Sequence, residues 1–259
     1  SVQNHNVSGM SRLMLFLALS RTPHGLLDMT TPIYGALLWL GAFTSLYISL
    51  IGLITVFAGY TAVYALNDVI DYRVDREKAR MAGGLREADS YLDAAMVRHP
   101  MAQGLLSFSE GLTWAVGWSA VAVIGAYLLN PVCVLIFLAG CAHETIYCLM
   151  HRISPFRTII SGGVKTSGAV AAVIAVDPNP SMVYVIVLFL WLFFWEIGGQ
   201  NVPADWADIE EDSRLGAQTV PVRVGPHNAA GIAVFTIVLA LLLNPVLIGL
   251  STIGFQPLL

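Results

Sequence analysis

Two groups of aspartates provide the side chains of this sequence that are best suited to chemistry. The first group, Asp68, Asp71 and Asp75, lies in the stretch ALNDVIDYRVDREKAR, which directly follows a long apolar run. If this stretch is helical, steps of three and four residues place the three carboxylates on one helix face. Because like charges at that spacing repel each other, such a group indicates a function that needs concentrated negative charge.

The second group repeats the spacing of the first. Asp205, Asp208 and Asp212 also follow an apolar run, again with steps of three and four residues. An asparagine precedes each group, Asn67 in the first and Asn201 in the second. A solvated, salt-bridged helix end is the alternative for a single copy, and the matched pair makes that alternative the weaker interpretation.

Carboxylates at this density predict bound cations and, through them, a bound polyanion. Six carboxylates close together at one end of the apolar segments can all stay ionised only if cations lie beside them. Oxygen ligands suit Mg²⁺, which usually combines one or two carboxylates with water and substrate phosphate oxygens. Arginines and lysines interleaved with the acids suit a polyanion beside the metal. We therefore expect the aspartates to hold metal ions, and the ions to hold a diphosphate.

The composition places these groups in a membrane protein. Of the 259 residues, 56% are hydrophobic and only 12% are charged, whereas soluble domains carry about 25% charged residues. The net charge of −4 gives no indication of nucleic-acid binding. Three cysteines lie in one apolar stretch without metal-ligand spacing, which indicates packing. The predicted fold class is an all-α, polytopic membrane helix bundle.

Seven apolar segments are long enough to cross a bilayer, at about 20 residues each. They are 25–45, 48–66, 107–127, 131–149, 158–176, 181–201 and 226–243. We expect residues 1–259 to form a single transmembrane domain. Because the sequence stops within apolar residues, we also expect it to be incomplete at its C-terminal end.

The basic residues predict the orientation of these spans. All 13 lysines and arginines lie before the first span or in and near the loops that follow even-numbered spans. The opposite loops, around 46–48, 127–131 and 177–181, contain none. By the positive-inside rule, the N-terminus and both aspartate groups are cytoplasmic.

Three segments of the chain resemble motifs of the UbiA superfamily of intramembrane prenyltransferases. NDVIDYRVD is similar to the first aspartate motif of that family, and DWADIEEDSRLGAQTVPVRVG to the second motif with its following T-x-P segment. RHPMAQGLLS, at 98–107, resembles R-P-x-x-x-G-x-x-S with His99 inserted after the arginine. The resemblance implies a UbiA-like bundle of nine helices, about seven of them visible here, and a cytoplasmic cap formed by the loops between spans 2 and 3 and spans 6 and 7.

The resemblance also implies a reaction. Two Mg²⁺ ions bind between the motifs and hold a polyprenyl diphosphate, whose chain is transferred to an aromatic or lipid acceptor within the membrane lipid. Metal and basic side chains neutralise the departing diphosphate, and the acceptor attacks an allylic cation in a cavity that excludes water. The acceptor and the length of the prenyl chain remain open.

Individual residues receive roles in this interpretation. The expected metal ligands are Asp68, Asp71, Asp75, Asp205, Asp208 and Asp212. The expected catalytic residues are Asp68, Asp71, Asp205, Asp208 and Tyr147. The residues expected to bind substrate are Asn67, Arg76, Lys78, Arg98, Arg152, Lys165 and Asn201.

The sequence departs from the family at two lysines. The family often has Y-x-x-x-K after the fourth span, where this chain has Tyr147 with His151 at the lysine position, and Arg152 is the candidate to supply the missing charge. Ala204 replaces a lysine that precedes the second motif.

Other ionisable residues lie within or beside the spans and have two possible roles each. Glu144 and Glu196 either line the cavity or form an interhelical hydrogen bond. His24 and Asp28 either line the acceptor pocket or cap a helix. Arg21 is a further residue that could face the site.

Prenyl transfer has two alternatives. A cation channel or transporter with an acidic cytoplasmic mouth would also gather carboxylates, but transporter ion sites usually lie near the bilayer midplane. CDP-alcohol phosphotransferases use a D-G-x-x-A-R pattern that this sequence lacks.

Overall fold

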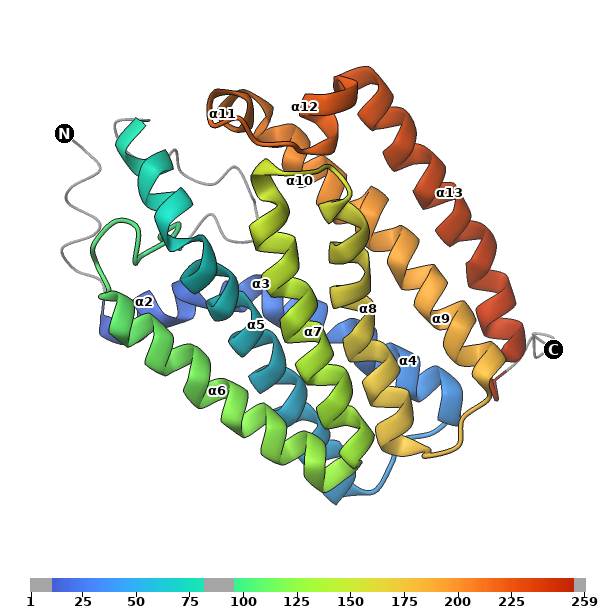
Figure 1. The fold of residues 1–259 in the computed structure, drawn as a ribbon. Helices are drawn as coiled ribbons and strands as arrows, with labels where there is room; N and C mark the ends of the chain where they lie inside the picture. The colour runs from blue at the N-terminus through green and yellow to red at the C-terminus, as the bar shows by residue number, and fades with distance from the viewer. Residues whose placement is uncertain (1–10, 82–95, 254–259) are drawn as a thin grey trace. The chain divides into compact units, whose positions relative to one another are not determined.

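The computed structural model describes residues 11–81 and 96–253, and these ranges contain helices and no strand (Figure 1). The predicted all-α class is therefore confirmed. The helices are α2 Arg12–Leu19, α3 Thr22–Asp28, α4 Thr30–Leu40, α5 Leu46–Met81, α6 Phe108–Leu129, α7 Pro131–Leu149, η1 Met150–Arg152, α8 Arg157–Val176, α9 Met182–Trp195, η2 Glu196–Asn201, α10 Val202–Ala207, α11 Ile209–Arg214, α12 Val220–Val224 and α13 Pro226–Leu250.

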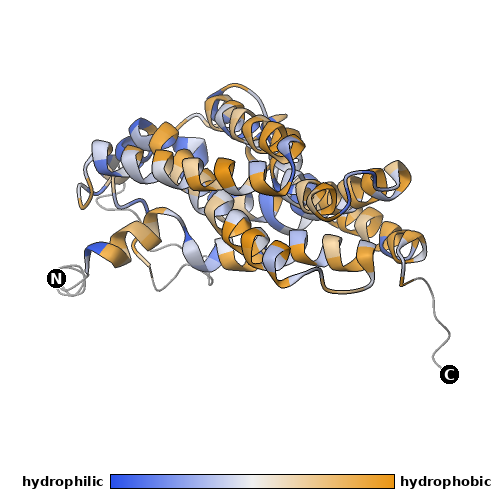
Figure 2. Cartoon of the chain, turned by 90° about the horizontal axis from the view of Figure 1, so that it is seen from below, coloured by the Kyte–Doolittle hydropathy of each residue, from blue (hydrophilic) through white to orange (hydrophobic). Residues whose placement is uncertain are grey.

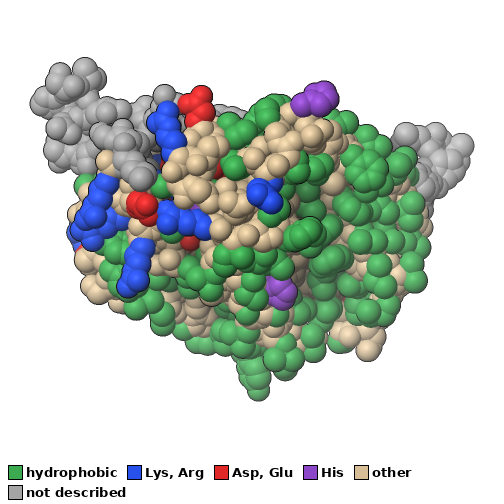
Figure 3. Space-filling view, turned by 45° about the horizontal axis from the view of Figure 1, so that its top comes forward, with side chains coloured by type: hydrophobic (Ala, Val, Ile, Leu, Met, Phe, Trp, Pro, Cys, Tyr) green, Lys and Arg blue, Asp and Glu red, His purple; other side chains and the backbone are tan. Residues whose placement is uncertain are grey.

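Six helical stretches of the described chain are long and apolar enough to cross a membrane. They are Leu46–Arg80, Phe108–Leu129, Pro131–Arg152, Arg157–Val176, Met182–Ala207 and Pro226–Leu250. Apolar residues dominate these helices (Figure 2) and cover much of the face shown in Figure 3. Leu135, Phe235 and Leu241 are each more than 60% exposed, as expected of side chains that face lipid. The chain is an integral, multi-pass membrane protein.

The first predicted span, 25–45, is not one helix. The backbone turns at Met29, between α3 and α4, and α4 ends at Leu40 before Gly41, whose φ is 68°. Pro32 lacks the N–H that would bond to the carbonyl of Asp28 in a continuous helix. The 11 residues of α4 are shorter than the roughly 20 that a membrane-spanning helix needs.

The chain divides into two compact units, which are described separately. The first contains residues 1–29 and 57–122. Within it, apolar side chains from α2, the later part of α5, the segment before α6 and the start of α6 form one core, with Leu19 and Ala65 fully buried. Phe16 stacks on Trp114 at 4.7 Å, and Trp114 donates a hydrogen bond of 2.8 Å to Ser20 Oγ. This core fixes the helix that carries the first aspartate motif.

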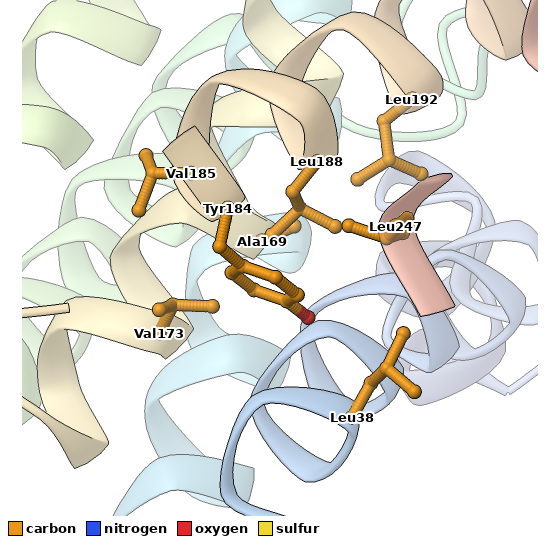
Figure 4. Close-up of a cluster of buried hydrophobic side chains, with 8 residues drawn as sticks. All are labelled: Leu38, Ala169, Val173, Tyr184, Val185, Leu188, Leu192 and Leu247. Carbon is orange, nitrogen blue, oxygen red and sulfur yellow. The ribbon is translucent and has the colours of Figure 1, made fainter. Parts of the chain in front are cut away.

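The second unit contains residues 30–56 and 123–259. Its main core lies among α4, α8, α9 and α13, and Figure 4 shows the buried side chains that meet there. Tyr184 lies at the centre and donates a hydrogen bond of 2.8 Å to the carbonyl of Gly35. Because a buried hydroxyl without a partner is costly, this bond fixes α4 against α9. The division of the chain does not test the prediction of a single transmembrane domain, which stays a prediction.

A π-helix, η2, connects α9 to the second aspartate motif. It covers EIGGQN, residues 196–201, and Pro203 follows it in the first turn of α10. Gly198 allows η2 to approach α13 closely, since an added Cβ would overlap the carbonyl of Ala233 and the side chain of Thr236. π-helical turns of this kind occur frequently at functional sites.

We expect Gly198→Ala to destabilise the protein by about 1–3 kcal/mol, because the added methyl group meets the α13 backbone. The measurement is thermal unfolding in detergent. Gly231→Ala on α13 is the matched control, since its Cβ would meet no atom within 4 Å and alanine favours a helix. Equal unfolding temperatures for the two variants would contradict the close packing of η2.

Candidate metal sites at the two aspartate motifs

The first aspartate motif lies within the continuous helix α5. Asp68 and Asp75 are buried, with 3% and 4% of their surface exposed, while Asp71 is partly exposed. Asp68 and Asp75 both contact His99. The structure therefore brings the first and third carboxylates to one helix face, as their spacing predicts.

His99 is the central partner of this motif, and the sequence showed it only as an insertion after Arg98. Its Nδ1 lies 3.0 Å from Asp68 Oδ1 and 2.9 Å from Asp75 Oδ2. Burial of the ring opposes protonation, but the two carboxylates outweigh that effect and raise the pKa of His99 to about 9. The imidazole is therefore a cation at neutral pH, fixed between two acids.

Asp68 is also contacted by Arg21, whose Nη2 lies 3.6 Å from Asp68 Oδ1. Among the described residues other than glycine, Arg21 and His99 are the two with positive φ, at 44° and 48°. A left-handed backbone at such residues costs about 1–2 kcal/mol. Strain of this kind persists where the surroundings enforce it, often at functional sites. Here it accompanies two basic side chains that meet one carboxylate.

The other first-motif candidates lie on or near the same helix. Arg76 is exposed and lies over the ring of Tyr72, 5.9 Å from its centroid. Lys78 is buried, and Asn67 and Arg98 are partly buried. The contacts of these four residues do not test their substrate-binding roles, which stay predictions.

The second aspartate motif is divided between two short helices. Asp205 lies in α10, Asp212 in α11, and Asp208 at the turn between them, with φ −98° and ψ 9°. The pattern of burial nevertheless repeats that of the first motif. Asp205 and Asp212 are 6% and 2% exposed, and the middle acid, Asp208, is partly exposed.

Arg157, at the start of α8, connects this motif to α7. Its Nη2 lies 3.1 Å from Asp205 Oδ1 and donates a 2.8 Å hydrogen bond to the Tyr147 hydroxyl. Its Nη1 contacts His151 Nδ1, and His151 Nε2 lies 3.7 Å from Asp212 Oδ1. One buried guanidinium therefore joins the aromatic ring, the histidine and the first acid of the motif.

Arg152 was the predicted source of the missing charge near Tyr147, and Arg157 was not among the predicted site residues. Arg152 ends η1 and is exposed, whereas Arg157 is 6% exposed and lies 4.3 Å from the centroid of the Tyr147 ring. The available signal was an arginine five residues further on, at the start of an apolar helix, where a charged side chain needs a partner.

Asn201 extends the same network toward the membrane-spanning part of the unit. Its amide donates hydrogen bonds of 3.2 Å to the Tyr147 hydroxyl and to Ser161 Oγ. Ser161 donates in turn to Glu196 Oε1 at 3.3 Å. Tyr147 and Asn201, both predicted site residues, thus lie together, whereas Lys165 lies two turns along α8, about 12 Å from Arg157.

Two of the lesser candidates are buried and hydrogen-bonded. Asp28, in the first unit, accepts a hydrogen bond from the Tyr64 hydroxyl and has His24 Nε2 at 3.9 Å. Glu144, in the second unit, has the thiol of Cys148 at 3.9 Å. Both carboxyl groups therefore have a structural role, and a role at an acceptor pocket is not tested by these contacts.

The donor sets fit magnesium in both motifs. Each offers three carboxylates, and oxygen ligands are those that Mg²⁺ prefers. The first and third acids of each motif face a basic side chain, while the middle acid is partly exposed. Asp71 and Asp208 are therefore the partly exposed carboxylates of the two motifs, and which acids hold a metal ion stays a prediction.

The fold and these sites define the class of the protein: a helical, multi-pass membrane protein with two clusters of carboxylates that lie beside basic side chains. The chain belongs to the UbiA prenyltransferase family, whose model matches residues 29–259. The prediction of that family, and with it the prenyltransferase class, is confirmed.

Similar proteins agree with this assignment. The digeranylgeranylglyceryl phosphate synthase of Methanosarcina mazei is 26% identical over 61% of this chain, and the match spans 54% of that relative's length. The synthase of the same name from Thermococcus kodakarensis is 23% identical over 93% of this chain and 82% of its own length. A UbiA homologue from Archaeoglobus fulgidus, solved with DMAPP and Mg²⁺, has a TM-score of 0.70 at 18% identity, covering 88% of this chain and 76% of that one.

His99 should make the stability of the metal-free protein depend on pH. Because its folded-state pKa of about 9 exceeds the ordinary 6.5, its contribution is complete below pH 6.5 and is lost as the pH rises through about 9. At about 1.36 kcal/mol per pKa unit, that contribution is about 3 kcal/mol. We expect the unfolding temperature in EDTA to decrease as the pH rises from 6.5 to about 9. In the His99→Asn variant most of this decrease should be absent.

Asparagine suits this test because it tolerates a left-handed backbone but cannot carry the positive charge. The matched control is His227→Asn, since His227 is exposed at the start of α13. The control should retain the pH dependence of the parent protein. A His99→Asn protein with that same dependence would show that the bridge between Asp68 and Asp75 carries no charge.

Proposed function

We propose that this protein transfers a polyprenyl group from a polyprenyl diphosphate to a lipid acceptor, in a reaction that depends on Mg²⁺. The observation that carries the proposal is the paired arrangement of acids, in which the first and third aspartates of each motif are buried beside a histidine or an arginine and the middle one is partly exposed. Membership of the UbiA prenyltransferase family supports the donor class. The A. fulgidus homologue that was solved with DMAPP and Mg²⁺ supports the metal and the diphosphate.

The aspartates would hold the metal, and two ions are proposed because there are two motifs. When bound, Mg²⁺ neutralises negative charge on the diphosphate as the carbon–oxygen bond breaks. Asp71 and Asp208 are partly exposed and are the proposed ligands that complete each site. The remaining acids keep their orientation through His99, His151 and Arg157.

The chain's own residues have three further tasks in this proposal. Arg76, Lys78 and Arg98 bind the diphosphate oxygens of the donor, and the apolar helices exclude water from the allylic cation that forms when diphosphate departs. Tyr147 is proposed to stabilise the cation through its aromatic ring, because aromatic faces stabilise nearby cations.

The proposed acceptor is a prenylated glycerol phosphate, because both curated relatives are named digeranylgeranylglyceryl phosphate synthase. An aromatic acceptor is the second possibility within the class. The test is to incubate the purified protein and Mg²⁺ with geranylgeranyl diphosphate and a panel of both acceptor kinds, followed by mass spectrometry of the products. Products from aromatic acceptors alone would overturn the acceptor assignment, and no prenylated product from any acceptor would overturn the function.

Changing the middle aspartate of either motif should remove activity. We expect Asp71→Ala and Asp208→Ala each to lower turnover by at least about 10²–10³-fold, the scale on which losing one group that stabilises transition-state charge acts. The measurement is product formation at saturating Mg²⁺. Glu210→Ala is the control, since Glu210 is an exposed acid beside the second motif. Near-normal turnover in either aspartate variant would show that its motif holds no essential metal.

The proposed orientation places the N-terminus and both aspartate motifs in the cytoplasm. A reporter inserted within residues 82–92 should therefore read cytoplasmic, and one at 178–180 should read external, because the basic residues lie on one set of loops. The measurement is a pair of reporters active on opposite sides of the membrane. Two reporters on the same side would contradict the order of the spans and the shared location of the motifs.

A further inference from the structure

We propose that Arg157 is the positioning residue of the second aspartate motif, and that residues 151 and 157 together provide one cation site for that motif. In this chain an arginine on α8 fills the site, and a lysine at position 151 would supply a positive charge to the same site. The inference rests on the proposed metal role of the motif. It adds the group that orients Asp205, which neither the motif pattern nor the relatives' names assign.

The contacts of Arg157 support a positioning role. A single guanidinium lies 3.1 Å from Asp205 Oδ1, 2.8 Å from the Tyr147 hydroxyl, and in contact with His151 Nδ1. Since guanidinium is planar and forked, it fixes the direction of each partner as well as its distance. Asp205 is held through Oδ1, so the direction of its second oxygen is fixed as well.

The burial of the network explains why a charge is needed there. Arg157 and Asp205 are each 6% exposed, and a buried carboxylate is costly unless it is paired with a charged group. The neighbouring lysine of the family pattern is absent, because Ala204 precedes Asp205. Arg157 is therefore a cationic partner that orients this acid.

The geometry also explains why two positions share the site. His151 lies in η1 and its Nδ1 touches the Nη1 of Arg157, while its Nε2 lies 3.7 Å from Asp212 Oδ1. A side chain at position 151 therefore reaches the space that the guanidinium occupies. The backbone N–H of Gln218 donates a hydrogen bond of 2.8 Å to the backbone carbonyl of His151, which fixes η1 beside the motif. A lysine ammonium at position 151 would thus bring a positive charge to the place of the guanidinium.

The experiment measures binding of Mn²⁺, a paramagnetic substitute for Mg²⁺, by electron paramagnetic resonance, without any prenyl donor. Losing a group that orients a metal ligand typically weakens metal affinity by about 10- to 100-fold. In the Arg157→Ala variant we expect this loss of affinity for one class of bound Mn²⁺ ions. Arg157→Lys, which keeps the charge but loses the fork, should lose less. The double variant His151→Lys with Arg157→Ala should recover most of the affinity.

Two further variants make the result specific. Arg223→Ala, an exposed arginine on α12, should bind Mn²⁺ as the parent protein does. Arg152→Ala removes the arginine that the sequence alone favoured. This variant should also bind Mn²⁺ with nearly the affinity of the parent protein. If Arg157→Ala does not fold, the comparison of Arg157→Lys with the double variant still decides, because both keep a positive charge at the site.

The outcomes separate this inference from the proposed function. Unchanged Mn²⁺ affinity in folded Arg157→Ala, or a double variant no better than Arg157→Ala, would overturn the inference and leave the prenyltransferase proposal standing. A purely structural role for Arg157 would lower the unfolding temperature but leave Mn²⁺ affinity unchanged in the folded protein, and would also overturn it. A parent protein that binds no Mn²⁺ would overturn both.

Discussion

Each aspartate motif depends on one physical constraint, which is that a carboxylate buried from water needs a cation beside it. Asp68, Asp75 and Asp205 satisfy this requirement with a basic side chain from a distant part of the sequence, and Asp212 has His151 Nε2 at 3.7 Å. Removing one partner of such a pair is strongly destabilising, since it leaves an uncompensated buried charge. The segment before α6, the helix η1 and the start of α8 must therefore take the positions they have. The two motifs resemble each other in this arrangement more closely than in their backbone, which is one helix in the first and two in the second.

Much of this could be predicted from local sequence. The acidic spacing gave the shared face of Asp68 and Asp75, because a helix repeats every 3.6 residues and α5 is unbroken there. Apolar length gave the positions of six of the seven predicted spans. Tyr147 and Asn201 were each named as site residues from the family pattern, and they are hydrogen-bonded to each other. In each case the determining information lies within a few turns of one helix, or in a motif that the chain shares with its family.

The remaining features depend on contacts between distant residues, which local spacing does not encode. His99 is 31 residues from Asp68 in sequence and Arg157 is 48 residues from Asp205, so neither partner could be assigned from the motif itself. The first span was wrong as a single helix because one proline outweighed the apolar length around it. The second motif is divided because the chain turns at Asp208. Both divisions reflect single backbone positions within otherwise helical sequence.

The orientation of the second motif depends on the π-helix that precedes it. A π-turn contains one residue more than the α-helical turn it replaces, so η2 sets the rotation of everything after it. If residues 196–201 rewound as an α-helix with no residue removed, the following helix would turn by about 100°. Asp205 would then leave the side of the helix that faces Arg157. A change of helix type in this segment would therefore disarrange the second motif while every one of its aspartates remained in the sequence.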